Sequence, residues 1–118
     1  MVKVKRAYEP VARGDGRRIL VERLWPRGIA KDDPRVGEWL RDVAPSADLR
    51  RWYGHDPSRW AEFRRRYRAE LRSERRPLIE ALADRARRGN VTLVYAARDT
   101  ERNSALVVRN EVEKVSAA

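Results

Sequence analysis

A short apolar run in this chain changes abruptly into a basic and aromatic segment. Residues 19–21 are Ile-Leu-Val, a continuous apolar pattern that is typical of a strand covered on both faces. Arg23, Trp25 and Arg27 follow directly, and Pro26 between them lacks the N–H group that a sheet ladder requires. Ligands of open α/β sheets bind at the carboxyl ends of the strands. The segment therefore predicts where a functional site lies, although it does not indicate a reaction.

Length and composition restrict the class of protein. A chain of 118 residues is expected to form one domain, residues 1–118. Cysteine is absent and histidine occurs once, so we expect no disulfide, no thiolate catalysis, no metal site and no cofactor. The first residues lack the apolar core of a secretory signal, and no window has the ~18 apolar residues of a membrane span. These features predict a cytoplasmic protein without membrane association.

The chain is strongly basic, with a formal net charge of +10 and a pI of about 10.9. An excess of this size favours a polyanionic partner such as nucleic acid. However, only Lys3, Lys5, Lys31 and Lys114 are lysines, and all other cationic side chains are arginines. A GC-rich genome produces the same skew without selection for binding, so the charge count leaves both interpretations open.

The apolar patterns predict three strands and several helices. Strands are expected at residues 2–8, where apolar and polar residues alternate, at 19–21, and at 91–95. A short amphipathic helix is expected from the Asp33-Pro34 start to about residue 43, and Ser46 is expected to cap a second one that ends near Gly54.

Three further helices are predicted at residues 57–72, 77–88 and 105–115, with Gly89 as a left-handed stop after residue 88. The order strand, strand, helices, strand, helix predicts an α/β fold. We expect a small, mostly parallel sheet of about three strands, flanked by helices, in a single compact, helix-rich domain.

Arginines follow two of the predicted buried strands. Arg23 and Arg27 come after the strand at 19–21, and Arg98 comes after the strand at 91–95. If these strands are parallel and adjacent, the three guanidinium groups converge near the positive end of the last helix. Such a cluster suits a phosphate, sulfate or carboxylate, which guanidinium binds in a bidentate manner. In the competing interpretation, Arg23 pairs with a neighbouring acid, Glu22 or Asp99, and only connects loops.

Other side chains near this edge are candidates for binding or proton transfer. Asp99 and Asn103 flank the start of the last helix, where both residue types favour capping. We expect Asn103 to cap, whereas for Asp99 capping and proton transfer stay open. His55 titrates near neutral pH and is either a proton-transfer group or an exposed turn residue. The candidate catalytic residues are Asp99 and His55, and the candidate ligand-binding residues are Arg23, Trp25, Arg27, Arg98 and Asn103.

Several segments resemble the YeaO-like bacterial family, which corresponds to domain of unknown function 488. The resemblance rests on Leu-Val-Glu-Arg-Leu-Trp-Pro-Arg-Gly at 20–28, Ala-Pro-Ser at 44–46, Leu-Arg-Arg-Trp-Tyr-Gly-His-Asp-Pro at 49–57, Phe-Arg-Arg-Arg-Tyr-Arg-Ala-Glu-Leu at 63–71 and Leu-Val-Tyr-Ala-Ala-Arg-Asp at 93–99. It covers the chain from about residue 2 to residue 112. It implies a compact α/β domain with helices flanking a small sheet, and it implies no particular reaction, substrate or cofactor.

The chain also departs from the pattern of this family. Longer relatives carry Cys-His-Arg after the last strand, where this chain has Arg98-Asp99 and no cysteine, so thiol chemistry is not implied. Glu22 stands where the family usually has Asp. The positions that the resemblance carries over as signature residues are Arg23, Trp25, Pro26, Arg27, Gly28, Ser46, Trp52, His55, Arg98, Asp99 and Asn103.

These observations predict a protein that binds a small anionic ligand (phosphate, nucleotide or carboxylate) at the carboxyl ends of the strands, with or without catalysis. The alternatives are a nucleic-acid-binding module that uses the arginine-rich face of the helix at 57–72, or an interaction protein with an acidic partner. The oligomeric state is not indicated by the sequence.

Overall fold

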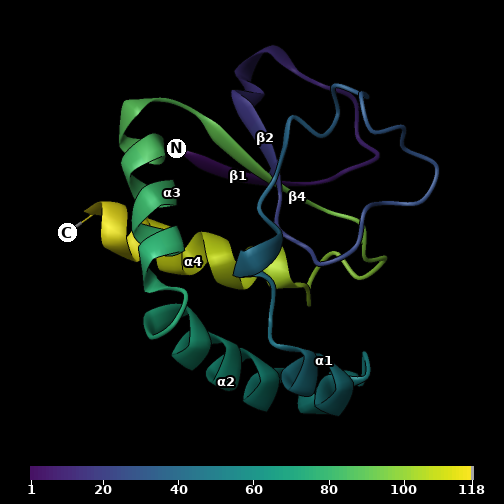
Figure 1. Cartoon of the computed structure of the whole chain (residues 1–118), viewed down its shortest axis with the longest axis vertical. Helices are drawn as coiled ribbons and strands as arrows, with labels where there is room; N and C mark the ends of the chain where they lie inside the picture. Colours follow the sequence, from purple (N-terminus) through teal and green to yellow (C-terminus); the bar gives the residue numbers. More distant parts are fainter. Residues whose placement is uncertain (118) are drawn as a thin grey trace.

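The sheet contains four parallel strands, with helices packed against one of its faces (Figure 1). The computed structural model of the chain describes residues 1–117, so the last position of the predicted domain lies outside the described residues. The strands are β1 (Val2–Arg6), β2 (Arg17–Leu20), β3 (Glu38–Trp39) and β4 (Val91–Tyr95). Their order is β1-β4-β2-β3, and each neighbouring pair is parallel. The predicted α/β class is confirmed, with four strands rather than about three.

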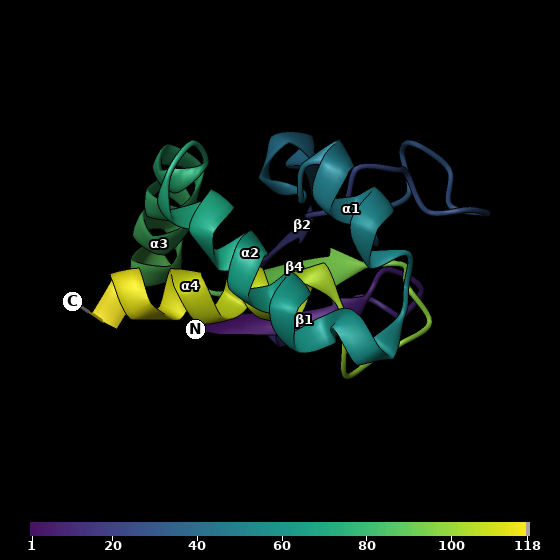
Figure 2. The same cartoon turned by 90° about the horizontal axis from the view of Figure 1, so that it is seen from below.

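Four α-helices follow the spacing of the apolar residues. They are α1 (Ala47–Tyr53), α2 (Trp60–Arg72), α3 (Arg76–Arg88) and α4 (Ser104–Ala117). Short 3-10 turns occupy Arg13–Asp15, Arg41–Val43 and Pro57–Arg59. Helix α4 runs along the sheet, as Figure 2 shows. None of the helices within residues 1–117 has the length and apolar character needed to cross a membrane.

The two faces of the sheet are covered differently. On one face, Ile19 of β2 and Leu93 of β4 belong to the main core, which they share with apolar residues of the helices. On the other face, Leu20 and Val94 belong to a smaller core with residues of the connecting loops, including Ile29. Adjacent residues of a strand point to opposite faces, so Ile19 and Leu20 of β2, like Leu93 and Val94 of β4, supply apolar side chains to both cores.

The predicted helix after Asp33-Pro34 is wrong. The Asp33 carboxylate accepts a hydrogen bond from the Arg35 backbone N–H at 2.9 Å and pairs with the Arg35 guanidinium at 2.8 Å, so it stabilises a turn. The chain then adds β3 to the sheet, with Glu38 opposite Ile19.

The helix-like spacing in this segment arises because its apolar residues serve two different cores. Val36 and Trp39 belong to the small core on the loop-covered face. Val43 belongs to the main core, and Leu40 packs against it. Apolar residues at intervals of three and four therefore do not lie on one helical face here.

The helix ends agree with the predicted caps except at one glycine. The Ser46 hydroxyl accepts a hydrogen bond from the Leu49 backbone N–H, and Gly54 adopts the left-handed conformation after α1, with φ of 54°. At the end of α3, the prediction of a left-handed Gly89 is wrong, because its φ of 174° is extended. Its N–H still donates to the carbonyl of Arg85, so α3 ends without a left-handed residue.

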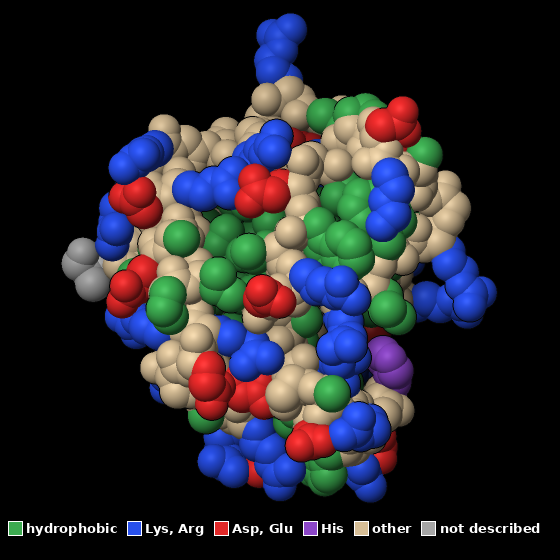
Figure 3. Space-filling model, in the orientation of Figure 1, with side chains coloured by type: hydrophobic (Ala, Val, Ile, Leu, Met, Phe, Trp, Pro, Cys, Tyr) green, Lys and Arg blue, Asp and Glu red, His purple; other side chains and the backbone are tan. Residues whose placement is uncertain are grey.

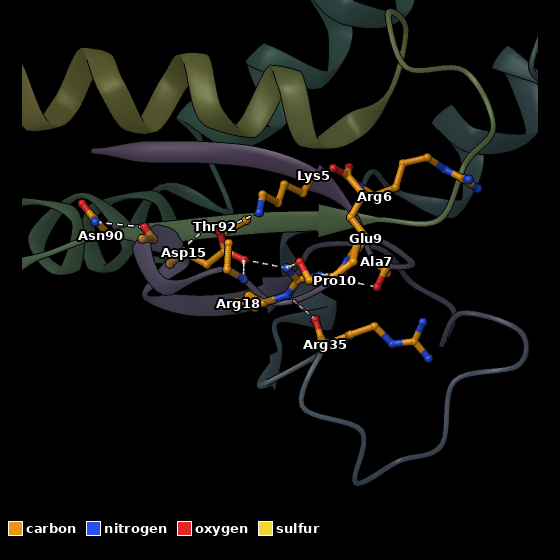
Figure 4. Close-up of polar contacts among 12 residues, drawn as sticks. Lys5, Arg6, Ala7, Glu9, Pro10, Asp15, Arg18, Arg35, Asn90 and Thr92 are labelled. Atoms are coloured by element: carbon orange, nitrogen blue, oxygen red, sulfur yellow. Dashed lines mark hydrogen bonds and ion pairs between the residues drawn. The ribbon is translucent and has the colours of Figure 1, made fainter.

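A buried ion pair fastens the loops to the face of the sheet opposite α4 (Figure 4). Arg18 is 2% exposed and Asp15 is fully buried, and they are joined by a 2.7 Å contact between Nη1 and Oδ2. Lys5 Nζ lies 2.7 Å from the other carboxylate oxygen of Asp15. The Arg18 guanidinium also donates to four backbone carbonyls, those of Ala7, Glu9, Pro10 and Arg35. One side chain thus connects β2 to both loops that cover this face.

Candidate functional site

A cleft of about 720 Å³ opens at the carboxyl edge of the sheet. Its walls are formed by residues that follow β1, β2 and β4, by α1, and by the first residues of α2 and α4. Since the strands are parallel, their carboxyl ends all reach this edge, and Figure 2 shows the arrow of β4 pointing toward the side of α1. The cleft thus lies where the sequence predicted a site.

All five predicted ligand-binding residues line this cleft. They are Arg23, Trp25, Arg27, Arg98 and Asn103. His55 also lines it, whereas Asp99 is not among the lining residues that the structure describes.

The guanidinium groups of Arg23, Arg27 and Arg98 have no hydrogen-bond or ion-pair partner within residues 1–117, and all three side chains are exposed. The two acids that were considered as partners of Arg23 are engaged elsewhere. Glu22 accepts a hydrogen bond from the Ala96 backbone N–H at 2.7 Å, and Asp99 pairs with Arg102 at 3.0 Å. No contact in the described chain therefore supports the interpretation in which Arg23 only connects loops.

Three further arginines line the cleft, and the sequence analysis missed them. Arg6 donates to the carbonyls of Ala96 and Ala97, Arg50 donates to that of Pro45, and Arg102 pairs with Asp99. Arg6 is the last residue of β1, which ends two residues before the end of the predicted strand at 2–8, so the prediction placed Arg6 inside the strand and not at its carboxyl end. Arg50 lies inside α1, and no pattern in the sequence indicated that it reaches the cleft.

Positive charge in the cleft is not balanced by acidic side chains. Six arginines line it, and Glu22 is its only lining carboxylate among the described residues. Burial lowers the pKa of Arg50, and the nearby positive charges of Arg23 and Arg51 lower it further. The cleft is therefore a region of positive potential.

Glu22 also lines the cleft, although it was not predicted from the sequence as a site residue. It directly follows the buried end of β2, and one of its carboxylate oxygens is held by the Ala96 N–H. Burial raises the pKa of Glu22, while hydrogen bonds from the backbone of Ala96 and Ala97 and the charge of His55 act in the opposite direction. The acid that lines the cleft in the described chain is thus kept in a poorly solvated position.

Aromatic side chains line the cleft between these polar groups. The Trp25 indole donates to the Ile29 carbonyl at 2.6 Å and meets Trp39 edge to face, with ring centroids 5.5 Å apart. From the α1 side, Tyr53 lines the cleft and stacks on Phe63 with centroids 4.4 Å apart. Trp25 and Tyr53 are each half-buried and are fixed by packing on other rings.

Leu24 lies at the same cleft and is 73% exposed. Its side chain therefore adds apolar contact area to the charged rim of the cleft.

The remaining candidates have specific structural roles. Asn103 is 4% exposed; its side-chain oxygen caps α4 by accepting from the Leu106 N–H, and its amide donates to the Asp99 carbonyl. Asp99 accepts hydrogen bonds from the backbone of Glu101 and Arg102, and these contacts lower its pKa. Both residues therefore shape the turn that leads from β4 into α4.

His55 is exposed and lies in the left-handed region with φ of 56°, an uncommon conformation for a residue other than glycine. Its ring centroid lies 6.1 Å from that of Tyr53. Within residues 1–117 there is no group of three or more acidic or histidine side chains with the arrangement of a metal site.

The arginine-rich face of α2 is partly neutralised by neighbouring acids. Glu62 pairs with Arg65 at 2.6 Å and with Arg66 at 2.8 Å, and Arg72 pairs with Glu111 at 2.9 Å. Figure 3 accordingly shows acidic and basic side chains interspersed over the region of α2 and α3. In the cleft, by contrast, three arginines have no ion-pair partner among the described residues.

The fold and the cleft together define a small α/β protein with a basic, aromatic-lined cleft at the carboxyl edge of a parallel sheet. The chain belongs to the DUF488 family, because the model of the subclade described as "Inactive DUF488-N3 subclade" matches residues 1–118. It is 47% identical over 107 residues to an uncharacterized protein of Mycobacterium tuberculosis H37Rv, which covers 91% of this chain and 89% of the relative. It is 42% identical over 107 residues to the uncharacterized protein YeaO of Escherichia coli K12, covering 91% and 92%. No solved structure matches the chain.

Proposed function

We propose that this protein binds a small anionic ligand in the cleft, held by Arg23, Arg27 and Arg98, and that it does so in the cytoplasm. The observation that carries this proposal is the set of three exposed guanidinium groups that have no partner within residues 1–117, in a cleft lined by six arginines. Like charges brought together without counterions destabilise a fold, and a bound anion removes that cost. Guanidinium forms paired hydrogen bonds with phosphate and carboxylate oxygens, so these are the chemical groups expected.

The first turn of α4 supports the same ligand class. Ser104, its first residue, lines the cleft, and free backbone N–H groups at a helix start favour an anion. Asn103 fixes the start of this helix, as described above. The helix end thus adds to the arginines rather than acting as a separate site.

Binding without turnover fits the chemistry of the described residues better than catalysis. Asp99 is engaged in the turn before α4, and its lowered pKa keeps it ionised at neutral pH, so it is a poor proton donor. His55 lines the cleft and is the one described residue there that was a candidate for proton transfer. The description of the subclade as inactive is consistent with a binding role.

A thermal-shift screen tests the proposal. The parent protein is heated with phosphate, sulfate, nucleotides and carboxylates, and with a short DNA duplex, each at two salt concentrations. A ligand present at ten times its Kd stabilises the native state by about 1.4 kcal/mol, which raises Tm by about 5 °C for a domain of this size. We expect such a shift from at least one small anion, and its loss in Arg23→Ala. Arg65→Ala, on the ion-paired face of α2, is the matched control and should retain it.

The same screen separates this proposal from nucleic-acid binding. If only the duplex raises Tm, if the shift disappears at higher salt, and if charge reversal at Arg65 and Arg68 removes it, the α2 face is the binding surface instead. If no anion raises Tm, the proposal of an anion site is wrong.

A further inference from the structure

The carboxylate of Glu22 is not paired with any of the six arginines that line the same cleft within the described chain. One of its oxygens accepts the Ala96 N–H at 2.7 Å. A carboxylate has about four acceptor positions, so this contact leaves capacity for further hydrogen bonds. The Ala97 backbone also hydrogen-bonds to this carboxylate, and the charge of Arg6 lowers its pKa without a direct ion pair. The remaining acceptor positions of Glu22 are available to hydrogen-bond donors of a ligand.

The aromatic walls add a second requirement. Tyr53 and Trp25 belong to different segments, α1 and the loop after β2, and both line the cleft. Phe63 stacks behind the Tyr53 ring with centroids 4.4 Å apart, and the Ile29 carbonyl fixes the Trp25 indole at 2.6 Å. Rings that are held in place in this way offer a planar ligand a surface at little cost in entropy. For Trp25 this is the ring face that Lys31 Nζ, 4.4 Å from the ring centroid, leaves open.

The arginines, the Glu22 carboxylate and the aromatic walls together fit a more complex ligand better than a simple anion. Inorganic phosphate satisfies the arginines only, and a sugar phosphate leaves the aromatic walls without a partner. An aromatic carboxylate lacks the hydroxyl donors that an unpaired carboxylate accepts. A volume of about 720 Å³ lies within the range of about 300–1,000 Å³ that is typical of small-molecule sites.

We propose that the ligand of this cleft is a nucleoside monophosphate. Arg23, Arg27 and Arg98 hold its phosphate, Glu22 accepts hydrogen bonds from its ribose hydroxyls, and Tyr53 and Trp25 pack against its base. This inference rests on the proposed anion-binding function and goes further by naming the class of ligand.

Calorimetric titration of the parent protein with AMP, UMP, ribose 5-phosphate and inorganic phosphate tests the inference. Base stacking on aromatic side chains corresponds to a gain in affinity of about 5- to 150-fold. We therefore expect at least one nucleotide to bind in that range more tightly than ribose 5-phosphate. Tyr53→Leu should reduce this preference, whereas Tyr53→Phe, which keeps the ring, should retain it.

The role of Glu22 is tested by a double comparison. AMP and its 2′,3′-dideoxy analogue are titrated into the parent and into Glu22→Gln, with Glu22→Asp as the conservative variant. We expect the parent to prefer AMP by about tenfold and Glu22→Gln to lose most of this preference, while the affinity for phosphate changes less than twofold in both variants.

The outcomes separate the two proposals. If phosphate, ribose 5-phosphate and both nucleotides bind equally and depend on Arg23, the nucleotide inference is wrong and the anion site stands. If Glu22→Gln prefers AMP over the dideoxy analogue as strongly as the parent does, Glu22 does not contact the ribose. If no anion binds, both proposals are wrong.

Discussion

Replacing Arg18 by methionine tests whether the buried ion pair holds the loop-covered face of the sheet onto β2. Methionine keeps the unbranched shape of the aliphatic stem and removes the guanidinium. The contact with Asp15 at 2.7 Å is lost, together with hydrogen bonds to carbonyls in both covering loops, the shortest at 2.6 Å to Arg35 and 2.8 Å to Glu9 (Figure 4).

The expected loss of stability follows from the burial of the pair. Removing one partner of a buried ion pair costs about 3–5 kcal/mol, because the other charge stays buried without compensation. Lys5 still lies 2.7 Å from the Asp15 carboxylate, which places the expected loss at the lower end, about 3 kcal/mol. Small domains are stable by only about 5–15 kcal/mol, so the variant should unfold at much lower denaturant concentration.

The pH dependence gives a second signature of the same pair. Burial alone would raise the pKa of Asp15, but hydrogen bonds from Lys5, from the Ala12 backbone and from Arg18 outweigh it and hold the pKa well below its usual value. A lowered pKa in the folded state stabilises the protein above the ordinary aspartate pKa of about 3.9, and this stabilisation is lost as the pH falls toward the folded-state pKa. Arg18→Met should therefore lose less stability than the parent between about pH 5 and pH 2.

Guanidinium denaturation followed by circular dichroism measures the free energy of unfolding. Arg17→Met is the matched control, because Arg17 is an exposed neighbour that pairs with Glu38 at 3.3 Å, and its loss should cost less than about 1 kcal/mol. If Arg18→Met costs no more than the control, the pair does not stabilise this face as argued here.

Three further predictions concern other positions. Tyr67→Phe should lower the free energy of unfolding by about 1–3 kcal/mol, because its buried hydroxyl donates to the Val43 carbonyl at 2.5 Å, and a denaturant titration that shows no loss would contradict this. Gly16→Ala should cost about 3 kcal/mol or more, since φ is +62° and the added Cβ would lie 1.9 Å from the Asn90 carbonyl oxygen; an unchanged Tm would refute that reading. Glu22→Gln should become more stable relative to the parent as the pH rises from 4 to 7. Because the pKa of Glu22 is raised in the folded state, the parent loses stability when this acid ionises, whereas glutamine cannot ionise. Parallel Tm profiles of the two proteins would argue against this prediction.

The sequence predicted the structure correctly where the residues of a segment serve a single structural role. The apolar runs of β2 and β4 predicted buried strands because both faces of each strand are covered. Ser46 and the stripe of Phe63, Tyr67 and Leu71 predicted helices α1 and α2 for equally local reasons. The sheet edge that contains the cleft was also predicted from the sequence, because parallel strands bring their carboxyl ends together.

The segment before α1 was mispredicted because its apolar residues serve two cores at once. Their spacing matches a helix, while the pairing of Glu38 with Ile19 that decides the structure involves residues far apart in the sequence. Arg18 and Asp15 were not predicted to be buried for a similar reason. Charged residues are usually exposed, and only the folded loops supply the carbonyl groups that make burial of an arginine favourable.

For the candidate site, the position of a residue in the sequence predicted where its side chain lies better than it predicted what the side chain does. The arginines after β2 and β4 do line one cleft, as expected from topology. Arg50 was missed because it reaches the cleft from α1, and Glu22 was missed because its separation from the arginines appears only in three dimensions.

The most direct test of the central claim is an NMR titration of the side-chain Nε–Hε signals of arginine with inorganic phosphate. We expect the signals of Arg23, Arg27 and Arg98 to shift together and saturate, while that of Arg65, paired with Glu62 on α2, does not move. Small shifts spread over the arginines of α2, without saturation at the cleft, would contradict the existence of an anion site at the carboxyl edge of the sheet.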